Sequence, residues 1–354
     1  MKRQELKEKL QPYVRGSMIG LAIGDALGMP VETMTYEEIM AVTNGKGITD
    51  FVAPIQKKFK SCRNFLPGQW TDDTQLALAV AESLIRSKGF NLEDQALAHV
   101  EAYKESTRGW GGTTKKSIEE IMNGIRKPNE PAKDKPDGGA GNGVAMKIAP
   151  LAIFHALKAT HLREKYYPCT YRIFKNDAIT LGLMTHHNFK ASIGALLVGN
   201  EIINQVHYRT GISPAQIGFN PLDWSKLIEE EIFDERLRGV LDMEKSFRKN
   251  LLPSLMTRDV EGLRGVTGMG FHVVDTVCFV LGIYRQMSYP YNFEDSIIKT
   301  ISSGGDADTN AAMVGAILGA KLGIDAIPQR WLDGLYKRDE IIKVADDLLD
   351  VSLE

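Results

Sequence analysis

The sequence predicts an all-α fold, and three observations lead to that prediction. Many segments combine strong helix formers with apolar residues three or four positions apart. Strand-like alternation of apolar and polar residues is scarce, with one short hairpin conceivable around Ile48–Val52. Glycines recur at every fourth position near both ends of the chain. The predicted helices are Thr74–Arg86, Leu92–Tyr103, Ser117–Met122, Val144–Ala156, Ala178–Met184, Ala191–Gln205, Val273–Tyr284, Ala311–Leu322 and Asp339–Leu349.

The glycine repeats indicate two closely packed helices. On a helix, glycines spaced four apart form a bare strip where another backbone can approach. Each interior glycine costs about 1 kcal/mol relative to alanine, so a strip of them needs a packing reason unless it arose by chance. We therefore expect both segments to be central. The first repeat is Gly16, Gly20, Gly24 and Gly28, and the second is Gly315, Gly319 and Gly323.

Two regions between the predicted helices are poor in helix signals. Lys127–Gly143 is rich in proline and glycine and is typical of a long ordered loop or an exposed linker. Gly211–Lys249 contains Pro214 and Pro221, then becomes highly charged, and we interpret it as a surface excursion. The two acidic motifs described below lie on opposite sides of both regions. If those motifs act together, residues 1–354 form a single domain.

Composition and charge exclude several classes of partner. The 43 basic and 45 acidic residues leave a formal charge of −2, so no global field attracts nucleic acid or an anionic membrane. Three widely separated cysteines provide neither a zinc motif nor a disulfide framework. The polar stretch Met1–Leu10 is unlike a signal peptide, and Met18–Val31 is too short to span a bilayer and contains Asp25. We expect a cytoplasmic protein that binds neither nucleic acid nor membrane.

The first acidic motif is Gln69–Thr74, in which Thr71, Asp72 and Asp73 precede an apolar helix. A threonine followed by acidic residues is a natural helix N-terminus, and capping alone explains Thr71 and one aspartate. It explains the adjacent pair less well, because neighbouring carboxylates repel each other unless a cation or hydrogen-bond donors lie between them.

The second acidic motif, Ser303–Asn310, repeats this design. After two glycines it presents Asp306, Asp308 and Thr309 just before a helix rich in small residues. Such oxygen-only ligands suit hard cations such as Mg²⁺ or Mn²⁺. Two such motifs in one chain indicate one or two divalent ions shared between helix N-termini, and a pair of ions could hold a substrate diol and a water.

Other candidate residues lie outside these motifs. Glu32 follows Met29-Pro30 and is either a third acidic site residue or an ordinary surface glutamate. Gly139–Gly143, placed before the helix predicted from Val144, is a candidate phosphate cradle. Gly109–Lys116 lacks the glycine that precedes the lysine of a P-loop, which excludes a nucleoside triphosphatase on that ground.

Two rings near flexible backbone are further candidates. His186, between two predicted helices, could contact a phosphate or a ribose, although most histidines of this kind are structural. Phe271 follows Gly268-Met269-Gly270 and could stack on a base, with core packing as the alternative.

Taken in order, these segments resemble the ADP-ribosylglycohydrolase family, which includes the dinitrogen reductase-activating glycohydrolase and the ADP-ribosylarginine and ADP-ribosylserine hydrolases. The resemblance extends over nearly the whole chain. Gly211–Lys249 and the loop around Trp110 are the parts that match no motif of the family. The matching segments are Gly16–Glu32, Gly68–Thr74, Gly141–Pro150, Thr185-His186, Gly304–Ala320 and Ile327–Trp331.

The resemblance implies a multi-helix fold around a central cleft with two Mg²⁺ or Mn²⁺ ions. It implies cleavage of the N- or O-glycosidic bond between ADP-ribose and its acceptor, in an ADP-ribosylated protein or small molecule. Glu32 would lie near the metals and the scissile bond, and Asn142, Gly143 and His186 would contact the diphosphate or the ribose. The implied metal ligands are Thr71, Asp72, Asp73, Asp306, Asp308 and Thr309.

The chemistry leaves alternatives open. Cleavage of a ribosyl bond passes through an oxocarbenium-like state, and we expect Glu32, Asp72 and Asp73 to be catalytic, without deciding which carboxylate is the general base. A low-turnover ADP-ribose-binding or immunity-type protein is a second hypothesis. A hydrolase of another ribosyl or nucleotide compound is a third. Because every acidic ligand is present, an enzyme is the leading interpretation.

Overall fold

The computed structural model describes residues 3–56, 64–132, 139–162, 167–211, 249, 253–254, 256–257, 259–286 and 292–354. Over these residues the chain forms helices and connecting segments without a strand, and the predicted all-α fold is confirmed. Ile48–Val52 is irregular backbone, so the hairpin conceivable there does not form.

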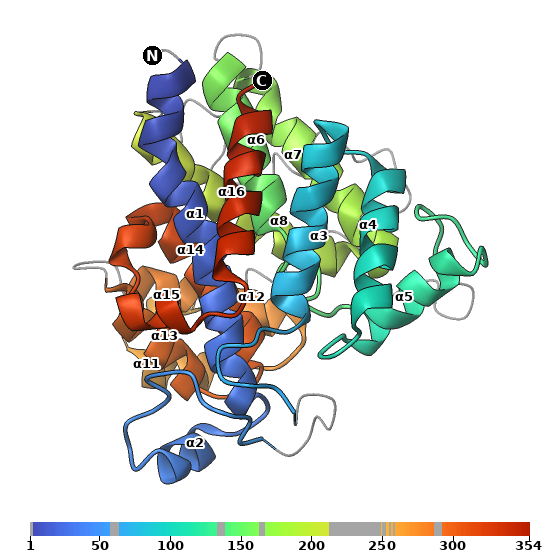
Figure 1. Cartoon of the computed structure of the whole chain (residues 1–354). Coiled ribbons are helices and arrows are strands. Elements are labelled where there is room, and N and C mark those ends of the chain that lie inside the picture. Colours follow the sequence, from blue (N-terminus) through green and yellow to red (C-terminus); the bar gives the residue numbers. More distant parts are fainter. Residues whose placement is uncertain are drawn as a thin grey trace.

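The helices follow one another along the chain as shown in Figure 1. The first half contains α1 (Arg3–Gly28), η1 (Met29–Val31), α2 (Tyr36–Val42), α3 (Asp72–Ser87), α4 (Leu92–Glu105), α5 (Gly112–Met122), α6 (Ala149–Leu162) and α7 (Tyr167–Thr185). The second half contains α8 (Phe189–Thr210), α11 (Val260–Val266), α12 (Val273–Gln286), α13 (Phe293–Ser302), α14 (Ala307–Leu322), η5 (Ile324–Ala326), α15 (Gln329–Gly334) and α16 (Arg338–Ser352).

Helices α1 and α14 form the most intimate contact of the fold, and they run antiparallel. A Cβ atom added at Gly16 would lie 2.5 Å from the carbonyl oxygen of Gly319, and one added at Gly20 would overlap the carbonyl oxygen of Gly315. At the other end of the contact, Gly28 packs against the backbone of Asp308. The predicted close packing of each strip is confirmed, and the structure shows that the two strips face each other. The contact leads directly into the second acidic motif.

Other helices surround this pair. Helix α16 lies beside α1, and the chain ends N and C lie at the same end of the molecule (Figure 1). Arg15 on α1 forms an ion pair with Asp346 on α16 at 2.6 Å. One hydrophobic cluster includes buried residues of α1, α3, α6, α8, α12, α14 and α16. None of the helices in the described ranges is long and apolar enough to cross a membrane.

The helix predicted from Val144 begins later than expected. Residues 143–147 form turns, and α6 begins at Ala149. A helix running from Val144 through Pro150 would lack the hydrogen bond from Pro150 to Met146 and would place the proline ring against that carbonyl group. Pro150 fits the first turn of α6, where no backbone donor is needed.

The excursion predicted at Gly211–Lys249 lies almost entirely outside the described residues. Gly211 itself ends α8 with a φ of 77°, in the left-handed conformation typical of a glycine at a helix end. The single-domain arrangement of residues 1–354 therefore stays a prediction.

Substituting Gly20 with alanine should destabilise the protein, because the new Cβ would overlap the Gly315 carbonyl group. We expect a loss of about 2–3 kcal/mol in the free energy of unfolding, measured by urea denaturation. Gly265→Ala is the matched control, since Gly265 lies in α11 with open space around its Cβ position. That control should be neutral or gain up to about 1 kcal/mol. Equal effects of the two substitutions would contradict the close backbone contact.

Candidate metal centre

Both acidic motifs lie at helix N-termini. Asp72 and Asp73 occupy the first turn of α3, and Asp306 and Asp308 begin α14. All four carboxylates are more than nine-tenths buried. Thr71 and Asp306 stand at the cap positions, but neither side chain caps its helix. Capping therefore does not account for the motifs, because their side chains are committed to other contacts inside the protein.

Asp25 on α1 is a site residue that the sequence analysis did not select. It is fully buried, and its carboxylate accepts hydrogen bonds from the backbone N–H of Thr71 at 2.9 Å and from the Thr71 hydroxyl at 2.7 Å. It also accepts from the backbone N–H of Thr74 at 3.0 Å and from the Thr74 hydroxyl at 2.6 Å. Asp25 thus ties the start of α3 to α1. The available signal was a carboxylate inside an otherwise apolar, glycine-striped segment.

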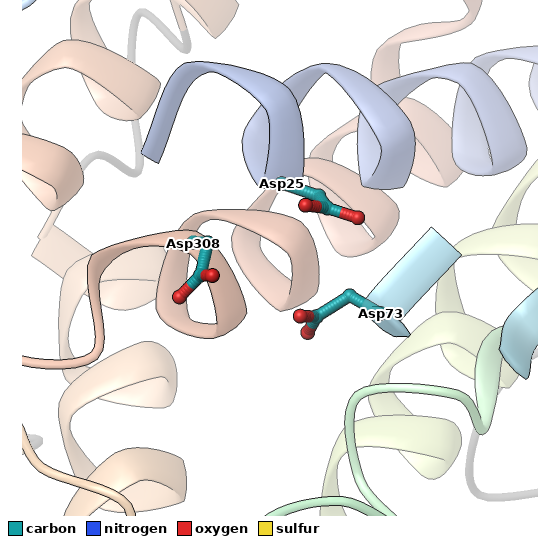
Figure 2. A group of neighbouring side chains, drawn as sticks. All are labelled: Asp25, Asp73 and Asp308. Carbon is teal, nitrogen blue, oxygen red and sulfur yellow. The ribbon is translucent and has the colours of Figure 1, made fainter. Parts of the chain in front are cut away.

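Carboxylates from three helices converge on one space. Figure 2 shows Asp25 from α1, Asp73 from α3 and Asp308 from α14 as neighbouring side chains. One oxygen of each lies within 4.8 Å of the others. Glu32, Asp306 and Asp308 form a second group by the same criterion. Because Asp308 belongs to both groups, the two groups are adjacent and could hold one or two cations.

The two predicted threonine ligands border these groups. The Thr309 hydroxyl donates to Asp73 Oδ2 at 3.3 Å, whereas the Thr71 hydroxyl donates to Asp25 at 2.7 Å. Asp73 Oδ1 is buried without a hydrogen-bond partner in the described part of the chain. An unsatisfied buried carboxylate oxygen is costly unless a cation contacts it, so the oxygen donor set fits a hard divalent ion.

Asp72 belongs to neither group, although its carboxylate is close enough to those of Asp25 and Asp306 for their charges to interact. A Cβ atom added at Gly109 would be 2.6 Å from Asp72 Oδ1, and the backbone N–H of Gly111 donates a hydrogen bond to Asp72. Trp110 between them is buried, and its indole N–H donates to Gln75 at 2.8 Å. The loop around Trp110, which could not be matched to a family motif from the sequence, therefore closes over the first acidic motif.

Burial and mutual repulsion make the carboxylate cluster electrostatically costly. Burial raises the pKa of Asp73 well above its ordinary value, and the carboxylates of Asp25 and Asp72 raise it further. Burial, followed by the Asp25 charge, raises the pKa of Asp72 to about 7. Burial likewise raises the pKa of Asp308, with Glu32 as the next cause. A divalent cation would remove this cost by stabilising the ionised forms.

Asn142 contacts the candidate metal centre directly. Its side-chain amide donates to Asp306 Oδ2 at 2.5 Å and to the Thr276 hydroxyl at 3.1 Å. The backbone N–H of Asp306 donates to the Met269 carbonyl oxygen at 2.6 Å. The segments predicted to contact substrate are therefore hydrogen-bonded to the second acidic motif.

The structure places the other predicted substrate residues beside Asn142. A Cβ atom at Gly143 would lie 2.8 Å from His186 Cε1, so the imidazole packs against that glycine. Phe271 has 45% of its surface exposed, which excludes the core-packing alternative, and its carbonyl oxygen accepts from the Asn142 backbone N–H at 3.1 Å. Because α6 begins at Ala149, Gly139–Gly143 is not at a helix N-terminus, and that part of the cradle argument is wrong.

An all-α fold in which buried carboxylates from three helices converge on one space defines a class of candidate metal-binding proteins. Comparison with known proteins identifies the family. The model of the ADP-ribosylglycohydrolase family matches residues 6–354, so the chain belongs to that family. The ADP-ribosyl-[dinitrogen reductase] glycohydrolase of Rhodospirillum rubrum is 28% identical over 94% of each chain.

Two further relatives extend the comparison. The ADP-ribosylarginine hydrolase Tri1 of Pseudomonas putida is 23% identical over 97% of this chain and 79% of its own. A solved structure described as an ADP-ribosylglycohydrolase-related protein complex superimposes with a TM-score of 0.64 at 24% identity, covering 98% of this chain and 99% of that one. That structure shares the fold.

The raised carboxylate pKa values predict a stability that depends on pH and on cations. A carboxylate with a raised folded-state pKa contributes stability below its unfolded pKa of about 4, and that stability is lost as pH rises through the folded value. For Asp72 the loss extends from about pH 4 to about pH 7. In EDTA, raising the pH from 5.5 to 8 should therefore lower the melting temperature of the wild type. The drop should be smaller for Asp73→Asn, which lacks one of these carboxylates.

Adding Mn²⁺ at pH 8 should raise the melting temperature of the wild type by several degrees and that of Asp73→Asn by less. Asp325→Asn, an exposed change outside the site, should behave as the wild type. Identical pH profiles for the wild type and Asp73→Asn, with no gain from Mn²⁺, would contradict the cation site.

Proposed function

We propose that this protein is a metal-dependent hydrolase of the glycosidic bond between ADP-ribose and an acceptor, and that it removes ADP-ribose from modified side chains. One observation carries the proposal: two groups of buried carboxylates share Asp308, in a chain that belongs to the ADP-ribosylglycohydrolase family. The names of the relatives support the same reaction class, since they describe hydrolases of ADP-ribosylated dinitrogen reductase and of ADP-ribosylarginine.

The proposed cation ligands come from the acidic motifs and from Asp25. When bound, Mg²⁺ or Mn²⁺ would supply positive charge for the ribose hydroxyls and would lower the pKa of a water. The protein contributes the arrangement of the ligands, because α1, α3 and α14 each deliver a carboxylate to one space. The full proposed set is Asp25, Thr71, Asp72, Asp73, Asp306, Asp308 and Thr309.

Glu32 is our proposed general base. Its carboxylate lies within 4.8 Å of ligand oxygens of Asp306 and Asp308, whereas Asp72 belongs to neither group and is held by Gly111. The backbone N–H of the next residue, Thr33, donates to the Gly305 carbonyl oxygen at 2.6 Å, which anchors Glu32 to the second motif. From this position Glu32 would take a proton from the attacking water.

The substrate is proposed to lie between the carboxylates and the Gly139–Gly143 segment. The diphosphate would lie against these glycines and His186, whose ring packs on Gly143. The exposed ring of Phe271 would stack on the adenine. This order places the ribose at the acidic groups and directs the acceptor away from the glycine segment.

The reaction itself tests the proposal. Wild-type protein with Mg²⁺ or Mn²⁺ should release ADP-ribose from ADP-ribosyl-arginine or ADP-ribosyl-serine peptides, and EDTA should abolish the release. Asp306→Ala should lower the rate by about 100-fold or more while retaining a helical circular dichroism spectrum. Asp325→Ala, an exposed change, is the matched control and should keep the wild-type rate.

The result of this assay also separates the alternatives. Tight binding of the peptides without release would favour a low-turnover binding or immunity-type protein. Hydrolysis of another ribosyl or nucleotide compound, but of neither peptide, would show that the same site acts on a different substrate. Full activity of Asp306→Ala would remove the shared-metal proposal.

Cation titration should show the special place of Asp308. Because Asp308 belongs to both carboxylate groups, Asp308→Asn should weaken Mn²⁺ binding throughout, by about tenfold or more in isothermal titration calorimetry. Asp25→Asn alters only the first group and Asp306→Asn only the second, so each should weaken part of the titration. An Asp308→Asn titration that matches the wild type would refute the shared ligand.

A further inference from the structure

Lys147 is a fully buried lysine that the proposed reaction does not use. It follows the glycine segment in the turns before α6. Its ammonium nitrogen lies 3.1 Å from His99 Nε2 and 3.4 Å from the Thr185 hydroxyl. Thr185 is the residue before His186, and its hydroxyl lies 3.0 Å from His186 Nδ1. Four polar side chains thus form one continuous chain of contacts inside the protein.

The hydrogen bond between His99 and the Gln95 carbonyl group determines which side chain is the donor between Lys147 and His99. His99 Nδ1 lies 2.8 Å from the Gln95 carbonyl oxygen, which can only accept. Nδ1 therefore carries the hydrogen, and Nε2 of His99 is an acceptor in the neutral ring. Burial, which lowers the pKa of His99 well below its ordinary value, favours that neutral ring. Lys147 must therefore be the donor to His99.

Lys147 is connected to His186 through the hydroxyl of Thr185. A lysine ammonium has donors only, so Lys147 also donates to the Thr185 hydroxyl. Burial lowers the pKa of Lys147 to about 7, while the Asp72 carboxylate opposes that shift. Even the neutral amine has two hydrogens, one for each of its two neighbours. The hydroxyl of Thr185 then has its own hydrogen to donate to His186 Nδ1.

This arrangement determines which edge of His186 carries a hydrogen. If Nδ1 accepts from Thr185, the neutral ring has its hydrogen on Nε2. Nε2 faces the glycine segment, since Cβ atoms at Gly141 and Gly143 would lie 3.4 Å and 3.2 Å from it. The ring thus directs a hydrogen-bond donor toward the segment proposed to hold the diphosphate.

We propose that Lys147 is a positioning residue which, through Thr185, holds His186 as the Nε2–H tautomer, so that the imidazole donates to a phosphate oxygen of the substrate. The proposal rests on the proposed function for the identity of the ligand. The hydrogen-bonded chain itself involves the protein alone. Two measurements therefore test the chain and the ligand separately.

The first measurement is the tautomer of His186. Long-range ¹H–¹⁵N NMR spectra of protein labelled with ¹⁵N-histidine should show the Nε2–H form, assigned by the signal lost in His186→Gln. Thr185→Val removes the donor hydroxyl at nearly constant volume and should abolish this preference, as should Lys147→Met. Thr185→Ser should restore it. An Nδ1–H tautomer in the wild type, or an unchanged spectrum in both Thr185→Val and Lys147→Met, would overturn the proposal.

The second measurement is ligand affinity by isothermal titration calorimetry. Thr185→Val should weaken ADP-ribose binding by about tenfold and leave adenosine and Mn²⁺ binding unchanged. Thr185→Ser, which keeps the hydroxyl, should bind ADP-ribose as the wild type does. Thr160→Val is the control, because Thr160 is a buried threonine on α6 whose hydroxyl donates to the Ala156 carbonyl oxygen. Equal losses for ADP-ribose and adenosine would overturn the role of the donor. If the wild type binds no ADP-ribose, the proposed function is refuted. The NMR measurement still tests the hydrogen bonds that connect Lys147, Thr185 and His186.

Discussion

Helices α1 and α14 touch backbone to backbone, and the acidic centre is built at one end of that contact. Glycine at four successive turns of α1 lets the helices approach until Gly28 packs on the backbone of Asp308. One turn earlier on α1, Asp25 is thereby brought within reach of Asp308. Bulkier residues along the strip would push the helices apart and separate the carboxylates. Close packing is therefore both the core of the fold and the geometric basis of the site.

Gathering these carboxylates opposes folding unless their charge is compensated. Burial and repulsion raise the pKa values of Asp72, Asp73 and Asp308. The protein offsets part of the cost through the hydrogen bonds that Thr71 and Thr74 donate to Asp25. The positive N-terminal ends of α3 and α14 offset a further part. What remains uncompensated, such as the unpaired oxygen of Asp73, is what a divalent cation would stabilise. The same residues thus reduce stability on their own and are the ones that we propose bind a divalent cation.

The proposed substrate segments are not independent of this centre. Asn142 donates to Asp306, and the backbone of Asp306 donates to Met269, so the glycine segment and the stretch before Phe271 are attached to the second acidic motif. On its other side the glycine segment contacts His186, whose orientation depends on Thr185 and on the buried Lys147. A substrate bound across these parts would therefore meet a preorganised surface. Preorganisation matters here because a bond that breaks through a charged transition state gains most from groups already in place.

The sequence by itself determined what depends on local pattern. Helix periodicity predicted the all-α fold, glycine spacing predicted two closely packed helices, and the paired aspartates of two motifs predicted an oxygen-ligand cation site. The tertiary structure decided which groups meet. Asp25 escaped the sequence analysis because its partners, Thr71 and Thr74, lie 46 and 49 positions away. Likewise, Phe271 is exposed and Asn142 contacts Asp306 because of helix packing between distant segments. The residues beside a side chain in the sequence indicate its local structure and the chemistry available to it. Its partners in space depend on how the helices pack.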